Sequence, residues 1–159
     1  MTTALYTHAS SARHDTGAGH PERIARIEAV NAALAGDSWS SLLRREAPLA
    51  TKEQLSRVHA AGYVDLILEN IPEDGYAHLD PDTVLSPGTG EAALRAAGAI
   101  ISAVDDVVAG TVDNAFCAVR PPGHHAEPGR GMGFCLFNNV AVGALHARAV
   151  HGLQKVAIV

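Results

Sequence analysis

Apolar residues along the chain alternate between short continuous runs and runs with helical spacing. The short runs predict strands over residues 5–7, 42–47, 115–119 and 155–159, and the last two are typical of buried parallel strands. Helical spacing predicts helices over residues 21–35, 51–58, 63–69, 91–108 and 139–150. Strands that alternate with helices indicate an α/β fold, with a mostly parallel sheet flanked by helices in three layers.

Local signals support several of these boundaries. Pro21 suits the first turn of a helix, and Gly36 can terminate that helix. Thr51 and Gln54 have the spacing of a capping box. Residues 70–91 contain several prolines and glycines and predict a long loop, which in a compact domain is usually functional or disordered.

Composition and charge exclude several classes of protein. The chain has 159 residues with 47% hydrophobic and 18% charged residues, which indicates one globular domain with a buried core. The net charge of −5 and the lack of a basic run argue against nucleic-acid binding. The sequence contains no apolar stretch long enough to span a membrane and no signal peptide at its start. Together with two cysteines that form no disulfide framework, this predicts a cytoplasmic protein.

The segment with the strongest chemical signal is 120–139, which reads RPPGHHAEPGRGMGFCLFNN. It begins where the predicted strand 115–119 ends, at the sheet edge where α/β proteins bind ligands. His124 and His125 are adjacent, so their side chains diverge on an extended loop and suit an acid/base role better than one shared metal. Two alternatives stay open, histidines that only cap backbone groups and histidines that ligate a metal. The metal role is the least favoured, because no partner stands nearby at ligand spacing.

This segment resembles the signature of the histone deacetylase superfamily, which also includes acetylpolyamine amidohydrolases and acetoin-utilisation proteins. Residues 14–26, 58–63 and 80–93 resemble further elements of that family in the same order, so the resemblance covers essentially the whole chain. The pattern is closer to the class II-like bacterial members than to class I. It implies the arginase/deacetylase-like fold, and the chain is expected to be the N-terminal portion, 1–159, of a single deacetylase-like domain whose sheet is incomplete at the C-terminal end.

The resemblance implies roles for residues of the 120–139 segment. Members of the family use a divalent metal, usually zinc, to polarise an acetamide carbonyl and activate water. By resemblance, His125 is the general base and later the general acid, and His124 is its electrostatic partner. Gly133 and Phe134 match residues that line the narrow channel for the acyl-lysine or acyl-amine chain.

Two further positions match family residues outside this segment. Asp82 matches a rim residue that accepts hydrogen bonds from substrate N–H groups, with Asp80 as the alternative because the alignment of this loop can slip. Arg26 matches an arginine beside the channel for acetate release, and a structural arginine paired with a carboxylate is the equal alternative.

The same resemblance predicts what this chain lacks. Family members carry zinc-ligating Asp and His residues directly after a strand like 155–159 and again later, so the Zn²⁺ ligands are expected beyond Val159 and none within the chain. The expected function is removal of acetyl or acyl groups from lysine side chains or polyamines. The 159-residue chain alone is expected to be inactive. Acetylated lysines or amines are the expected partners, and a homo-oligomer is compatible with the family.

Two other functions compete with the deacetylase. One is a truncated, non-catalytic deacetylase-like protein that binds a partner at most, through residues 78–90. The other is a nucleotide-binding α/β domain, which lacks support because no glycine-rich phosphate loop follows a strand.

Overall fold

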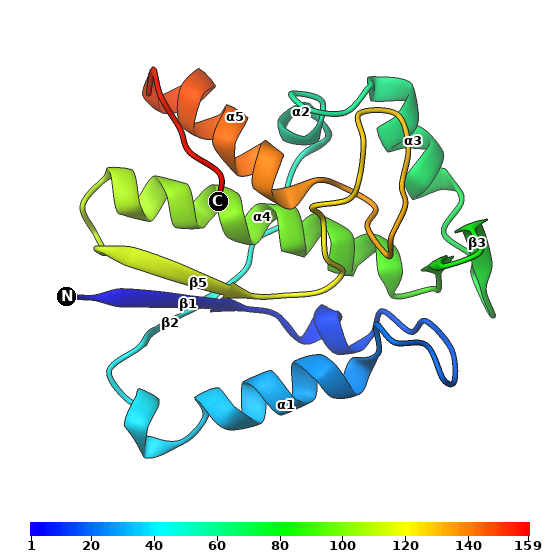
Figure 1. The fold of residues 1–159 in the computed structure, drawn as a ribbon, viewed down its shortest axis with the longest axis horizontal. Helices are drawn as coiled ribbons and strands as arrows, with labels where there is room; N and C mark the ends of the chain where they lie inside the picture. The colour runs from blue at the N-terminus through cyan, green and yellow to red at the C-terminus, as the bar shows by residue number, and fades with distance from the viewer.

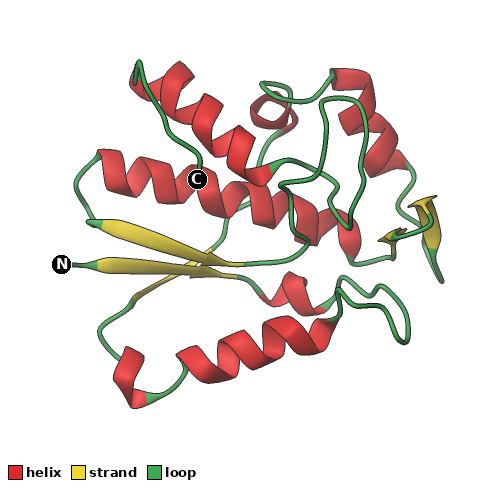
Figure 2. Ribbon diagram, viewed as in Figure 1, coloured by secondary structure: helices red, strands yellow, loops and turns green.

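The computed structural model describes all residues from 1 to 159 and centres on a parallel sheet with helices on both faces (Figure 1). The sheet contains β1 (Thr3–Thr7), β2 (Leu43–Glu46) and β5 (Asn114–Ala118) in the order β2-β1-β5, with both pairings parallel. Helix α1 (Ile24–Leu34) covers one face, and α4 (Thr89–Val108) and α5 (Asn139–His151) lie on the other (Figure 2). This arrangement confirms the predicted three-layer α/β fold.

Smaller elements surround this core. Helices α2 (Lys52–Leu55) and α3 (Ala61–Glu69) follow β2, and the capping box of Thr51 and Gln54 is present at the start of α2. Strands β3 (Ala77–Asp80) and β4 (Thr83–Leu85) form an antiparallel pair. Two short 3₁₀ helices follow β1 and α1 and span Ala9–Ala12 and Asp37–Trp39. No helix of the structure is both long enough and apolar enough to cross a bilayer.

Strand β1 supplies the centre of the core because its side chains alternate between the two faces. Leu5 packs with Ile27 of α1 on one side. Ala4 and Tyr6 pack with Ala99 of α4 on the other side. All five side chains are buried, so β1 is the layer that both helical faces share.

The structure corrects two sequence predictions. The segment 70–91 was expected to be a loop, but it contains the β3–β4 pair, whose strands are too short for a clear alternating pattern. The segment 155–159 was expected to be a buried strand, but it forms no ladder, and Ile158 is 63% exposed. An apolar run becomes a buried strand only where a neighbouring strand accepts its backbone hydrogen bonds.

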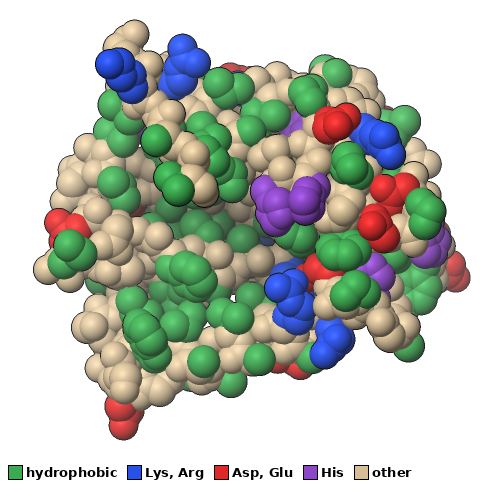
Figure 3. Space-filling model, in the orientation of Figure 1, with side chains coloured by type: hydrophobic (Ala, Val, Ile, Leu, Met, Phe, Trp, Pro, Cys, Tyr) green, Lys and Arg blue, Asp and Glu red, His purple; other side chains and the backbone are tan.

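Strand β5 is confirmed, but it lies at the edge of the sheet rather than in its interior. Phe116 at its centre is 52% exposed. A hollow of about 150 Å³ lies between β5 and α1, and one of about 320 Å³ lies between β5, α4 and α5. Hydrophobic side chains line a hollow on this face of the molecule (Figure 3). The unpaired edge therefore has apolar surface on both sides.

Helix α4 packs closely against the chain that follows β2, and Gly98 makes this approach possible. A Cβ atom at this position would overlap the carbonyl oxygen of Pro48 and lie 3.0 Å from the backbone nitrogen of Ala50. Because both neighbours are backbone atoms, they cannot move away from an added Cβ as a flexible side chain could.

We expect Gly98→Ala to lower the free energy of unfolding by about 1–3 kcal/mol, as overpacking does elsewhere. Gly62→Ala in α3 is the matched control, because a Cβ there meets nothing within 4 Å. The control should stabilise the chain by up to ~1 kcal/mol, since alanine is the better helix former. Urea unfolding measures both, and equal stability of the two variants would contradict the close packing at Gly98.

Candidate active site

The loop that carries the tandem histidines starts at the carboxyl end of β5 and is packed against the start of α5. Gly123 lies so close to α5 that a Cβ would be 2.5 Å from both the nitrogen of Asn139 and the carbonyl oxygen of Phe137. The Asn138 side chain accepts a hydrogen bond from the backbone of Ala141 at 3.0 Å and so caps α5. Its amide nitrogen donates to the carbonyl of Ala126 at 2.9 Å, which ties the cap to the residue after the histidines.

His59 holds the later part of this loop. The backbone N–H of Asn138 donates to its Nε2 at 2.9 Å, so Nδ1 carries the proton and donates to the carbonyl of Pro128 at 3.3 Å. Tyr63, one turn later, donates its hydroxyl to the carbonyl of Leu136 at 2.7 Å. Burial lowers the pKa of His59, which favours the neutral ring that these two bonds require.

The two tandem histidines lie exposed, with their ring centroids 4.2 Å apart and their planes tilted by 54°. The prediction that their side chains diverge is therefore wrong, because the loop is not extended here and the rings lie against each other. A Cβ on Gly133 would be 2.9 Å from the His125 ring, so only glycine fits there. Gly133 and Phe134 both have positive φ, 57° and 69°, which is a rare conformation for phenylalanine. Such strain often marks functional loops, and here it accompanies the turn that places backbone beside His125.

Phe134 and Asp82, both predicted to contact substrate, border the same cavity of about 450 Å³. His20 connects them, because its ring contacts Phe134 edge-on at 4.9 Å and one ring nitrogen lies 3.1 Å from the carbonyl oxygen of Asp82. The backbone N–H of Phe134 also donates to the Thr83 hydroxyl at 3.2 Å. The loop and the β3–β4 turn therefore build one rim.

The two candidate rim aspartates differ in their surroundings. Asp80 accepts a hydrogen bond from the backbone N–H of Asp82 at 3.1 Å. Partial burial raises its pKa, but hydrogen bonds from Thr83 and Asp82 outweigh this, and the net pKa is lowered. Asp82 is exposed and borders the cavity with Phe134, whereas Asp80 borders a different hollow, beside Tyr63. The geometry thus favours Asp82 as the residue that faces a ligand.

Beneath the histidine loop lies a buried ion pair. Arg120 donates from Nε and Nη2 to the two carboxylate oxygens of Glu22, at 2.5 and 2.6 Å, and both side chains are at most 4% exposed. Arg120 Nη1 donates to the carbonyl of Ser11 at 2.6 Å, and the Arg120 backbone N–H donates to the Ser11 hydroxyl at 3.1 Å. Arg120, the first residue of the RPPGHH segment, is therefore held in place by hydrogen bonds from both its backbone and its side chain.

His14 lies in the same buried cluster. Its Nδ1 lies 2.8 Å from the Thr89 hydroxyl at the start of α4, and its Nε2 lies 3.8 Å from Glu22. Burial lowers the pKa of His14 from 6.5 to about 4, and the positive charge of Arg120 acts in the same direction. The ring is therefore neutral at pH 7.

Arg26 also approaches Glu22, but from solvent. Its Nη1 lies 3.6 Å from the Glu22 carboxylate, and its side chain is 60% exposed. It borders the hollow between α1 and β5. Arg26 therefore faces both a carboxylate, as the structural alternative predicts, and an open hollow, as the acetate-channel alternative predicts.

Sequence reasoning missed the Glu22–Arg120 pair and the loop contacts of His59. Glu22 and His59 lie within residues 14–26 and 58–63, which resemble family elements, but nothing in the sequence marks either residue for these contacts. The partners are 98 residues apart for the ion pair and 79 apart for His59 and Asn138. The only sequence signal for the Glu22–Arg120 pair is that the two residues have opposite charges. The sequence contains many other oppositely charged residues, so this signal does not single out the pair. Cys135 is buried, and burial raises the pKa of its thiol.

The tandem histidines by themselves do not make a metal site. A zinc site needs three or four protein ligands. The structure contains one group of three potential ligand residues within ligand spacing, and it includes neither His124 nor His125.

Residues 20–159 match the family model of the histone deacetylase domain. The chain belongs to the histone deacetylase family. It is 39% identical over 142 residues to the histone deacetylase-like amidohydrolase of Pseudomonas aeruginosa, covering 89% of the chain and 37% of that protein. It is 40% identical over 122 residues to the human polyamine deacetylase HDAC10, covering 74% of the chain and 18% of that protein.

The solved structures agree with this assignment. The crystal structure of the HDA15 HD domain superposes with a TM-score of 0.86 at 35% identity, covering 94% of the chain and 44% of that structure's chain. The chain thus spans less than two thirds of the length of these histone deacetylase relatives. The residues that the family model matches, 20–159, include β5 and the histidine loop.

We expect Glu22→Leu to lower the free energy of unfolding by about 3–5 kcal/mol, because it leaves the Arg120 guanidinium buried without a counter-charge. The double variant Glu22→Leu/Arg120→Met should lose less than the sum of the two single variants. Arg26→Met is the control and should change stability by at most ~1 kcal/mol, since its pairing with Glu22 is exposed. Urea unfolding gives all four values, and additive losses would show that the pair is not coupled.

The stability of the chain should fall with acid because of His14. Its pKa is 6.5 when unfolded and about 4 when folded, so the neutral ring stabilises the fold above pH 6.5. That contribution, ~3 kcal/mol, is lost as the pH falls from 6.5 towards 4. His14→Gln should flatten this part of the pH profile of unfolding and leave a smaller slope from His59. An unchanged slope in the variant would rule out His14 as the source.

Proposed function

We propose that this chain contributes the acid/base residues and the substrate channel of an amidohydrolase that removes acetyl groups from lysine side chains or polyamines. The observation that carries the proposal is the tandem pair His124 and His125, exposed on the loop that follows β5. The His125 ring packs against Gly133, whose neighbour Phe134 borders the cavity that Asp82 also lines. The names of two relatives, a histone deacetylase-like amidohydrolase and a polyamine deacetylase, support this substrate class.

His125 is the proposed general base. A free ring nitrogen can take a proton from the attacking water and later give it to the leaving amine. His124, with its centroid 4.2 Å away, is the proposed electrostatic partner.

The substrate enters past Phe134 and Gly133 in this proposal. A methylene stem gains burial against the flat Phe134 ring, while the backbone of Gly133, which has no side chain, packs directly against the His125 ring. The exposed Asp82 carboxylate is placed to accept a hydrogen bond from a substrate N–H group. Arg26 is proposed to lie on the acetate path, since it borders the hollow between α1 and β5.

Zinc is the proposed cofactor, because members of this family polarise the amide carbonyl with a divalent ion. The residues around His124 and His125 do not fit it, as no carboxylate or thiolate joins them at ligand spacing. We therefore place the ligands outside residues 1–159 and assign the ion no step here.

The proposal also says which part of a domain the chain forms and where in the cell the protein is located. We propose that residues 1–159 form the N-terminal portion of one deacetylase domain, in which a further strand covers β5. The apolar hollows on both sides of that strand support this. Both cysteines are free, which fits the proposed cytoplasmic location.

In a zinc-loaded, active protein that contains this chain, His125→Ala should lower kcat for an acetyl-lysine substrate by about 10²–10⁴-fold. Zinc content should stay unchanged, because His125 is not a ligand in this proposal, and added imidazole should restore part of the rate. Hydrolysis of a fluorogenic acetyl-lysine substrate and metal analysis measure these effects. Loss of zinc together with the rate would instead make His125 a ligand. Substrate binding by wild-type protein with no hydrolysis would favour the non-catalytic alternative.

A further inference from the structure

A second group of histidines lies away from the tandem pair, where α4 and α5 end. The Nε2 atoms of His146 and His151 on α5 each lie 2.6 Å from the same carboxylate oxygen of Asp105 on α4. Helix α4 leads into the start of β5, and α5 runs back alongside it, so these residues lie at the amino ends of the strands (Figure 1). The tandem histidines follow the carboxyl end of β5 and therefore lie at the opposite edge of the sheet.

We propose that Asp105, His146 and His151 form a binding site for a transition-metal ion of the Zn²⁺ type, which Arg57 keeps closed in the metal-free protein. Two imidazoles and a carboxylate are a donor set that zinc prefers. Their ligand atoms already lie within 4.8 Å of one another. Metal–ligand distances of about 2.0–2.2 Å place ligands about 3.3 Å apart in a tetrahedron. The carboxylate oxygen, 2.6 Å from each Nε2, therefore has to move away by less than an ångström, and the two imidazole nitrogens, up to 4.8 Å apart, have to approach each other by as much as about 1.5 Å.

Burial and charge around these residues suit a cation. The His146 side chain is 5% exposed and held in place, while those of His151 and Asp105, at 22% and 47%, leave an open side for water as a fourth ligand. Asp105 lies in the last turn of α4, and His151 is the last residue of α5. The negative ends of both helix dipoles therefore point to the site.

Arg57 is the group that opposes metal binding. Its Nη1 lies 2.8 Å from Nδ1 of His146. Because a guanidinium can only donate, Nδ1 accepts, and the proton of His146 lies on Nε2, the atom that would bind the metal. A metal on Nε2 needs the other tautomer, whose Nδ1–H would face the guanidinium N–H. Metal binding must therefore displace Arg57.

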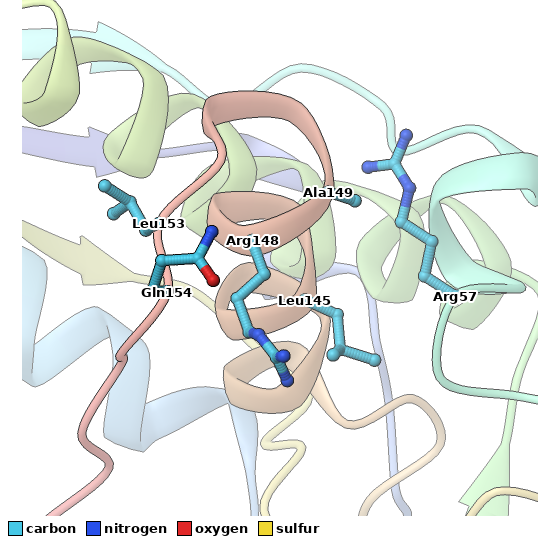
Figure 4. A pocket seen from close by; sticks show the side chains of 6 residues that line it. All are labelled: Arg57, Leu145, Arg148, Ala149, Leu153 and Gln154. Carbon is cyan, nitrogen blue, oxygen red and sulfur yellow. The ribbon is translucent and has the colours of Figure 1, made fainter.

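Other interactions are available to Arg57 when a metal displaces it from His146. Its Nη2 lies 3.8 Å from the Glu53 carboxylate one turn earlier. It also borders a hollow of about 380 Å³ beside α5, which Leu145 and Arg148 line from the helix (Figure 4). Arg57 and Arg148 project in different directions in this view, and both line the hollow. An incoming ion would exchange the Arg57–His146 bond for one between Arg57 and Glu53 or water.

Titration of the untagged 159-residue chain with Zn²⁺ by calorimetry, and with Co²⁺ by visible absorption, tests the site. One ion should bind per chain, and Asp105→Asn and His151→Ala should each weaken binding at least about tenfold. Arg57→Gln should strengthen it by about tenfold, because the glutamine oxygen can accept the Nδ1–H bond that orients a ligating histidine, as partners of metal ligands do. Circular dichroism checks the fold of each variant.

Two controls separate this site from other histidines. His78→Ala removes an exposed imidazole on β3, and a double His124→Ala/His125→Ala variant removes the tandem pair. Both should bind Zn²⁺ with the affinity of the original chain. Binding that follows the tandem pair, or that is indifferent to Asp105 and His151, would overturn the proposal. An unchanged affinity in Arg57→Gln would overturn the competing role of Arg57. None of these results depends on whether the protein is a deacetylase.

Discussion

Two opposite charges, Glu22 and Arg120, meet beneath the loop that carries the tandem histidines, and neither is in contact with bulk water. Burial of an ionised side chain is unfavourable unless the partner is close and the remaining donors are satisfied. Here the guanidinium satisfies both carboxylate oxygens and the carbonyl of Ser11. The geometry leaves little freedom, because moving either chain segment would separate the charges. The N-terminal segment and the end of β5 are therefore held in one relative position.

The histidine loop depends on contacts of a second kind at its other end. His59 and Tyr63 bind backbone groups of residues 128, 136 and 138, not side chains. Such bonds hold the course of the chain whatever the loop side chains are. With the ion pair at its start and these bonds at its end, the loop can keep Phe134 in a left-handed conformation that would otherwise be unfavourable. Rigid support of this kind suits a site whose tandem rings are themselves exposed.

The two histidine groups illustrate how neighbours decide what an imidazole can do. His124 and His125 lie beside each other with no carboxylate at ligand spacing, which suits proton transfer. His146 and His151 share one carboxylate, which suits a cation, but Arg57 holds the His146 tautomer in the form that cannot bind one. In the two proposals, the same type of side chain therefore serves different chemistry at the two edges of one sheet.

Local sequence was enough for much of the fold and for part of the site. Helical spacing in 91–108 and the capping box at Thr51 are set by neighbours in the chain, and the motif at 120–139 marked the histidine loop. Three features depend on which strands pair with each other, and no local sequence pattern determines that pairing. They are the β3–β4 pair, the edge position of β5 and the unpaired segment 155–159. The Glu22–Arg120 pair, the His59 contacts and the Asp105 cluster join residues 41 or more positions apart. Their energies come from burial and direct contact, so only the tertiary structure decided them.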